Sequence, residues 1–146
     1  MKPPSAAKLH CNEVDPAMSE LTAHVDLPLG CTAPAVARRV LGTTLPLWGF
    51  TDQPWLDGAS LVVTELVSNA VRHGGGCVSL ELRAHEAQVT LSVADGSAVV
   101  PRRADPDDAG GRGLLIIEAL SQRWGVEDHR GGKRVWVLLP PHPGPS

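Results

Sequence analysis

The chain has 146 residues, a formal net charge of −3 and 42% hydrophobic residues. This length and composition fit one soluble domain with a single core, and no apolar run approaches the roughly 20 residues that a membrane span needs. The weak negative charge gives no electrostatic basis for direct nucleic-acid binding. The start of the chain, Met1-Lys2-Pro3-Pro4, lacks the apolar centre of a signal peptide, so we expect a cytoplasmic protein.

The first expected elements are a polar segment and a short strand. Residues 1–22 have no hydrophobic period and are predicted to form a flexible tail. Apolar and polar residues alternate over 24–29, which predicts a strand, and Pro28 favours a sheet edge or the strand's end. We expect the folded domain to span 23–140 and residues 141–146 to form a second tail.

A first helix is predicted next. Thr32 is placed to cap it, and Pro34 would stand in its first turn, where the missing N–H of proline costs nothing. Pro46 indicates that this helix ends or kinks there. Trp48 and Phe50 are then expected to pack between this helix and the following one.

A longer amphipathic helix of about five turns follows, because apolar residues recur at helical spacing. Thr51 or Asp52 would cap it, and Pro54 would stand in its first turn. The glycine run 74–76 breaks the pattern after His73. The apolar stripe consists of Leu56, Ala59, Val63, Leu66, Val67 and Ala70.

Two alternating stretches, 78–83 and 88–93, predict a pair of half-buried strands joined by a short turn, and such a pair forms an antiparallel hairpin. The second strand runs into Asp95-Gly96. A polar loop, rich in proline and aspartate, extends from there to about residue 109.

The remaining elements complete the sheet. The glycine-rich residues 110–113 open a helix rich in leucine and isoleucine, and residues 124–128 suggest a strand. Residues 130–133 are predicted to form a turn before a buried final strand at 135–139. The sum is an α+β two-layer sandwich, with a mixed, mostly antiparallel sheet and helices on one face.

The three cysteines, Cys11, Cys31 and Cys77, are too widely spaced for a metal site or a disulfide framework. We expect free thiols, with Cys77 half-buried in a strand.

One pair of polar residues on the long helix is a candidate for catalysis and metal binding. Glu65 and Asn69 are four residues apart and therefore lie one above the other on one side of the helix. The carboxylate could polarise a water or a hydroxyl, and the amide oxygen could be a hard ligand for Mg²⁺. The same spacing also occurs in solvated faces and in weak side-chain hydrogen bonds.

Two further stretches bear on the same chemistry. Asp95 ends an apolar strand, so its carboxylate needs donors, which an adenine amine and a water could supply; Asp-Gly is also a common turn pair. Gly111-Arg112-Gly113 opens a helix, where bare backbone N–H groups form an anion site. A loop hinge or a close helix–strand contact is the alternative, and the pattern lacks the Lys-Ser/Thr of a P-loop.

In this order, the three features resemble the GHKL (Bergerat-fold) ATPases, the superfamily of gyrase, the mismatch-repair ATPases and histidine kinases. The stretch from about 24 to 139 is similar to the small anti-sigma-factor serine kinases. Residues 65–74, Glu-Leu-Val-Ser-Asn-Ala-Val-Arg-His-Gly, match their N box, and residues 111–120 match their second glycine box. Residues 123–126 and 132–136 also match the pattern of these kinases.

This resemblance implies a site for ATP and Mg²⁺. Glu65 would be the general base that activates the attacking hydroxyl or water, and Asn69 would ligate the Mg²⁺ that bridges the phosphates. Asp95, with Gly96 beside it, would accept a hydrogen bond from the adenine amine. The phosphates would be held by Gly111, Arg112, Gly113 and Leu114. The loop between Gly96 and Gly110 would be the ATP lid.

The chain also departs from the family pattern. Ser97, Ala98 and Val99 stand where relatives usually carry further lid glycines, which implies a stiffer hinge or weaker nucleotide binding. Arg134 stands where many relatives carry Thr near the adenine pocket, and it could perturb that contact. His73 follows the N box, either beside the phosphates or simply favoured by the helix dipole. A lid arginine, at 102, 103 or 112, could reach the γ-phosphate or stay solvated.

The resemblance finally implies partners. The expected activity is phosphorylation of a serine or threonine on a STAS-type anti-anti-sigma protein, together with sequestration of a sigma factor. Relatives often form homodimers, but nothing in this sequence fixes the oligomeric state. The alternative is a nucleotide-binding interaction module with little or no phosphotransfer, and the intact Glu65 and Asn69 favour the kinase. A histidine-kinase catalytic domain is disfavoured, since residues 1–22 do not resemble a helical, histidine-bearing dimerisation segment.

Overall fold

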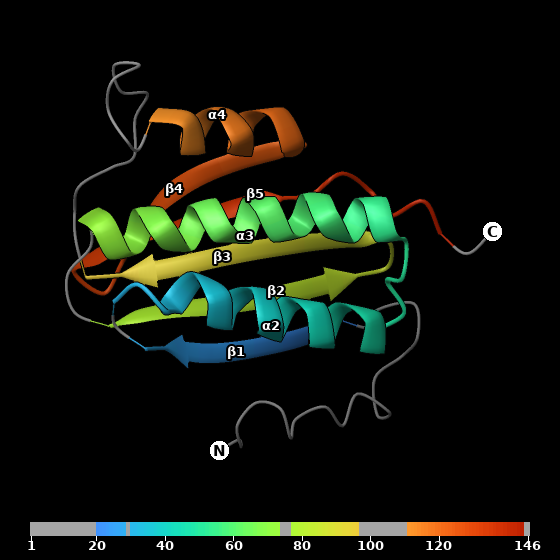
Figure 1. Ribbon diagram of the computed structural model, residues 1–146, viewed down its shortest axis with the longest axis horizontal. Helices are drawn as coiled ribbons and strands as arrows, with labels where there is room; N and C mark the ends of the chain where they lie inside the picture. The colour runs from blue at the N-terminus through green and yellow to red at the C-terminus, as the bar shows by residue number, and fades with distance from the viewer. Residues whose placement is uncertain (1–19, 29, 74–76, 97–110, 145–146) are drawn as a thin grey trace.

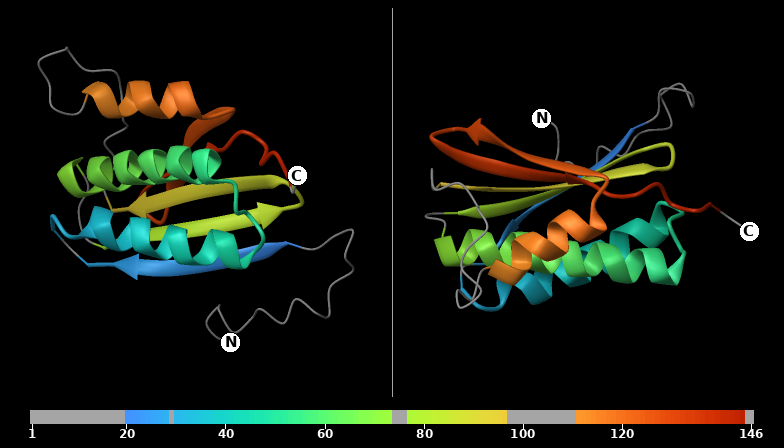
Figure 2. Two further views of the ribbon diagram at one scale, coloured as in Figure 1. Left: turned by 45° about the vertical axis from the view of Figure 1, so that its right-hand side comes forward. Right: turned by 90° about the horizontal axis from the view of Figure 1, so that it is seen from above.

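The computed structural model describes residues 20–28, 30–73, 77–96 and 111–144, and within these ranges three helices lie over one face of a five-stranded sheet (Figures 1 and 2). The predicted α+β two-layer sandwich is therefore confirmed. In chain order, the elements are β1 (Leu21–Leu27), α2 (Ala33–Leu47), α3 (Gln53–His73), β2 (Val78–His85), β3 (Gln88–Asp95), α4 (Gly111–Leu120), β4 (Arg123–His129) and β5 (Gly132–Leu138). None of the helices described is both long enough and apolar enough to cross a membrane.

The sheet has the order β1-β2-β3-β5-β4, and all four pairings of neighbouring strands are antiparallel. Two tight turns set its registers. Glu86 adopts φ 57° between β2 and β3, and between β4 and β5 both central residues, Arg130 and Gly131, have positive φ, 49° and 84°. Two-residue hairpins favour such turns because their backbone twist matches that of the strands.

The first strand begins earlier than the sequence pattern predicted. β1 starts at Leu21, inside the segment predicted to be a tail, and it ends at Leu27 rather than at residue 29. Its first residue pairs with Ala84 at the far end of β2, so strand pairing extends the element beyond the region of clear alternation. β1 is an edge strand, and Pro28 follows its end, as its missing N–H favours.

The helix boundaries follow the local signals. Thr32 occupies the cap position of α2 without a side-chain cap bond, and Pro46 lies inside the last turn. Asp52 caps α3, because the backbone N–H of Trp55 donates to its Oδ2 at 3.0 Å. As predicted, Phe50 is buried and Trp48 is partly buried against the core. Phe50 also stacks on the Trp55 ring of α3 at a centroid distance of 5.5 Å.

The core lies between the two layers. α3 lies across the middle of the sheet, with α2 on one side of it and α4 on the other (Figure 1). Burial of the core side chains removes a large apolar area from water, and this is the main term that stabilises the fold. The largest fully buried side chains are Leu41, Leu45, Val62, Val63, Val67, Leu80, Leu82, Val89, Leu91, Val93, Ile117 and Leu139.

The segment after β5 packs on the domain as far as residue 144. The N–H of His142 donates to the carbonyl of Ala87, and its Nε2 accepts from the Asp52 N–H at 3.1 Å. The indole N–H of Trp55 donates to the carbonyl of Pro140 at 2.8 Å. The His142 ring is buried edge-on against Phe50. Residues 141–144, predicted as a tail, therefore pack against the beginning of α3.

Cys31 and Cys77 are exposed free thiols. The prediction of a half-buried Cys77 within a strand was wrong, because β2 begins one residue later, at Val78.

Candidate nucleotide site

Three element ends that carry the predicted site residues meet at one end of the molecule. The β3 arrowhead, the C-terminal end of α3 and the N-terminal end of α4 lie on the same side in all three views (Figures 1 and 2). These segments are far apart in the sequence, and the antiparallel hairpins together with the crossover through α4 bring them together. This end of the sandwich, between the sheet and the helices, is the candidate site.

Asp95 contributes a buried carboxylate to this end. It is the last residue of β3 and only 6% exposed. Val89, Leu91 and Val93 alternate with it along the strand and belong to the core, so period-two alternation directs Asp95 toward the helices. A carboxylate in this position needs charged or polar donors, since desolvation without them is costly.

Lys133 supplies two of these donor contacts. Its Nζ lies 3.1 Å from Oδ1 and 3.0 Å from Oδ2 of Asp95, and both side chains are buried. The prediction that Lys133 belongs to a turn was wrong: the turn consists of Arg130 and Gly131 alone, and Lys133 is the second residue of β5, directly opposite Asp95. Counting back by twos from Val137 and Val135 would have put Lys133 on the buried face.

Gly132 allows the two strands to meet at this point. A Cβ at this position would overlap the carbonyl oxygen of Asp95 and would lie 2.7 Å from Cα and C of Gly96. The contact is with backbone atoms, which cannot turn away as a flexible side chain can. Glycine at 132 thus fixes how closely the exposed Gly96 and the end of β3 approach β5.

Glu65 and Asn69 lie on the flank of α3 that is nearer α4. On the opposite flank, Nη1 of Arg38 in α2 donates to Thr64 at 3.2 Å. A rotation of about 100° per residue then puts Glu65 and Asn69 away from α2, and both are half-buried. The Asn69 amide oxygen, the predicted Mg²⁺ ligand, accepts from Nη2 of Arg72 at 3.1 Å.

The glycine motif opens a helix, as expected. α4 begins at Gly111, and Leu114 in its first turn is buried with 4% exposure. The first backbone N–H groups of a helix have no partner within it and carry a partial positive charge. The predicted lid, 97–110, and residues 74–76 lie outside the described residues, as do the side chains of His73 and Arg112.

Arg134 does not lie beside Asp95. It follows Lys133 in β5 and therefore projects from the other face of the sheet, where its Nη1 is 3.9 Å from a carboxylate oxygen of Glu127. The expectation that Arg134 perturbs the adenine contact was based on sequence position alone. The strand alternation makes Lys133, rather than Arg134, the cation at the predicted base-binding residue.

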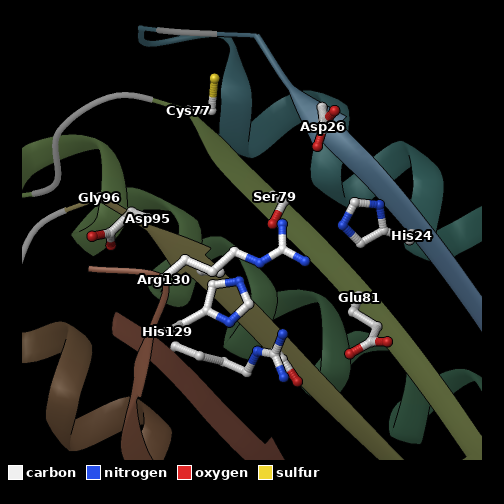
Figure 3. A pocket seen from close by; sticks show the side chains of 12 residues that line it. His24, Asp26, Cys77, Ser79, Glu81, Asp95, Gly96, His129 and Arg130 are labelled. Atoms are coloured by element: carbon white, nitrogen blue, oxygen red, sulfur yellow. The ribbon is translucent and has the colours of Figure 1, made fainter. Parts of the chain in front are cut away.

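The open face of the sheet carries a separate hollow of about 600 Å³. Its lining includes His24, Glu81 and His129 (Figure 3). Asp95 lies at one end of it, with its carboxylate oxygens directed away from His129. This hollow is therefore not the site predicted between the sheet and the helices.

The polar groups at the candidate site fit a nucleotide with its metal ion. A buried acceptor, a helix N-terminus and an amide oxygen are the groups that adenine, phosphates and Mg²⁺ require. Among the described residues, no cluster of three or more His, Cys, Asp or Glu side chains could hold a metal ion. A magnesium ion here would depend on Asn69 together with phosphate oxygens and water.

Comparison with known families agrees with this geometry. Residues 28–139 match the model of the histidine kinase-like ATPase domain. This match covers most of the chain, and the protein belongs to this family of GHKL-type ATPase and kinase-like domains. A search of curated proteins found no match.

A solved structure shares the fold, with a TM-score of 0.63. One similar structure is that of the RsbU and RsbW domains of Rv1364c from Mycobacterium tuberculosis, with a TM-score of 0.63 and 21% identity over 85% of this chain. The match covers 33% of that chain, so the protein spans about a third of its length. Another is the histidine kinase domain of the blue-light-activated histidine kinase EL346 from Erythrobacter litoralis, with a TM-score of 0.47 and 18% identity over 73% of this chain and 60% of that chain.

Proposed function

We propose that this protein binds ATP with Mg²⁺ and transfers the γ-phosphoryl group to a serine or threonine of a STAS-type anti-anti-sigma protein, and that it also captures a sigma factor. The observation that carries the ATP site is the meeting of β3, α3 and α4 at one end of the sandwich. Family membership supports nucleotide binding. The similarity of residues 65–74 and 111–120 to anti-sigma kinase motifs supports the choice of partners.

Each residue has a defined task in this proposal. Asp95 accepts a hydrogen bond from the adenine amine, and the N–H groups at the start of α4 hold phosphate oxygens. Asn69 donates an oxygen ligand to the metal ion, for which it must exchange its present contact with Arg72. Glu65 takes the proton of the attacking hydroxyl. Bound ATP supplies the transferable phosphoryl group, and the rest of catalysis is positioning and charge neutralisation.

The alternative function is a nucleotide-binding interaction module with little or no phosphotransfer. One contact favours it: Nη2 of Arg72 donates to the Asn69 amide oxygen, so the predicted metal ligand already has a protein partner. The two functions differ in turnover, while both require ATP binding.

Calorimetry with ATP, with and without Mg²⁺, tests the site. Asn69→Ala should abolish the gain in affinity that Mg²⁺ provides, while Asn69→Asp, which keeps an oxygen ligand, should retain most of it. Asp95→Asn should reduce the preference for ATP over GTP. If the wild-type protein binds neither nucleotide, or if Asn69→Ala leaves the response to Mg²⁺ unchanged, the proposed ligand set is wrong.

Labelled-phosphate transfer to purified STAS-domain proteins tests the activity. Glu65→Gln should bind ATP normally and lose transfer by about 10²–10⁴-fold, the usual contribution of a general base. Glu81→Gln is the matched control, because Glu81 is a half-buried carboxylate on the open face of the sheet. Tight ATP binding without transfer to any STAS protein would favour the nucleotide-binding interaction module. Equal transfer by Glu65→Gln and Glu81→Gln would show that Glu65 is not the general base.

A further inference from the structure

Asp95 and Lys133 form a buried ion pair at the candidate site. The two residues are directly paired across β3 and β5, and in the ion pair the side chains are 1% and 6% exposed, respectively. Lys133 reaches both carboxylate oxygens at nearly equal distance, 3.1 and 3.0 Å. A symmetric contact of this kind fixes the position of the carboxylate and also its rotation about the Cβ–Cγ bond.

We propose that Lys133 is a positioning residue for base recognition: it holds the Asp95 carboxylate in a fixed orientation, in which the carboxylate accepts a hydrogen bond from the exocyclic amine of adenine. This inference rests on the proposed function and deepens it. Lys133 acts through Asp95, since its ammonium group contacts the carboxylate on the helix-facing side of the sheet.

The chemistry of the carboxylate permits this shared use. An ionised carboxylate has about four lone-pair sites, so it can accept hydrogen bonds from several donors at once. A buried carboxyl group without a counter-charge is strongly disfavoured in its ionised form. Lys133 supplies this counter-charge to Asp95 at 3.0 and 3.1 Å.

The surrounding backbone makes the arrangement rigid. Gly132, which precedes Lys133, lies against the backbone of Asp95 and Gly96. The β4–β5 turn with positive φ at Arg130 and Gly131 sets the register that puts Lys133 opposite Asp95. The lysine is therefore held by the fold on the buried side, whereas its neighbour Arg134 pairs with Glu127 on the open side.

The test compares ATP with purine riboside triphosphate, which has hydrogen in place of the 6-amino group. The ratio of the two dissociation constants isolates the contact made by the amine, because phosphates and Mg²⁺ are common to both. A hydrogen bond to a charged group predicts a preference of about tenfold or more for ATP in the wild-type protein. In Lys133→Met the preference should fall to within about threefold of unity, and Lys133→Arg should restore most of it.

Arg134→Met is the matched control, since it removes a cation from the adjacent position of β5 without touching Asp95. Its preference for ATP should equal that of the wild type. If Lys133→Met keeps the wild-type preference, Lys133 has only a structural role; if the preference rises, the ammonium competes with the base. Either result overturns the inference, while ATP binding by the wild type leaves the proposed nucleotide site intact. A wild-type protein that binds neither nucleotide overturns both.

A second measurement covers the case in which Lys133→Met does not fold. The chain has three lysines, Lys2, Lys8 and Lys133, so ¹⁵N-lysine labelling of the wild type gives few side-chain signals. The Lys133 ammonium is buried and should give a slowly exchanging resonance. We expect ATP to shift it clearly more than purine riboside triphosphate does. Equal shifts with both nucleotides would contradict the role in base recognition.

Discussion

Gly132 offers a direct test of how the end of β3 is positioned. Replacement by alanine adds one methyl group and leaves charge unchanged. Gly132 lies in β5 and is not among the described glycines with positive φ, so alanine meets no backbone strain of its own. The added Cβ would overlap the Asp95 carbonyl oxygen and approach Gly96 Cα to 2.7 Å. Only a shift of one strand against the other can relieve that contact.

The expected cost follows from this contact. Ordinary carbon contacts are about 3.5–4.0 Å, so the methyl group intrudes by close to an ångström or more. Overpacking of this degree costs about 1–3 kcal/mol when the neighbours are backbone atoms. Gly42→Ala is the matched control: Gly42 lies inside α2, and a methyl group added there would meet nothing within 4 Å. Removing a helical glycine should stabilise the protein by about 0.5–1 kcal/mol.

Urea unfolding followed by tryptophan fluorescence measures both changes, because the chain contains four tryptophans. The free energy of unfolding should fall for Gly132→Ala and rise for Gly42→Ala at an unchanged m-value. If Gly132→Ala were as stable as the wild type, the close approach of β3 and β5 at Asp95 would be wrong, and with it the geometry assigned to the Asp95–Lys133 pair.

Three further changes test other contacts. Gly125→Ala would bring a methyl to 2.6 Å from the Trp136 ring, a side chain on the open face that can turn, so unfolding experiments should show a loss below about 1 kcal/mol. Asp52→Ala removes the cap of α3 and should lower the free energy of unfolding by about 1 kcal/mol; no loss would mean that the cap bond is unimportant. Arg72→Gln should leave stability within about 0.5 kcal/mol and tighten Mg²⁺-dependent ATP binding, as Asn69 is released; weaker binding would indicate that Arg72 itself contacts the nucleotide.

Much of the fold follows from local signals in the sequence. The apolar stripe of α3 and the alternation of β2 and β3 each depend on residues close together in the chain, and these elements form where predicted. The Asp52 cap is equally local. The start of β1 at Leu21 is not, because pairing with Ala84, more than sixty residues away, decides it. The docking of His142 on Phe50 is likewise a long-range contact that no local pattern indicates.

The candidate site divides in the same way. The spacing of Glu65 and Asn69 shows that they share a helix flank, but the sequence does not say that this flank turns toward α4 rather than α2. Asp95 could be recognised as a buried acceptor from its place at the end of an apolar strand. Its partner, Lys133, was missed because the residues around it suggested a turn, although only two of them form one.

The length of that turn determines the charge at the site. In β5, Lys133 faces the core and Arg134 faces the open side, and a register shift of one residue would exchange the two. Such a shift would also turn Trp136 inward and expose Val135 and Val137, so the apolar pattern opposes it. Both the positive φ values at Arg130 and Gly131 and the alternation of β5 therefore favour the same register. The register of β5, which the turn at Arg130 and Gly131 and the hydrophobic pattern of the strand set together, therefore determines which cation lies beside Asp95.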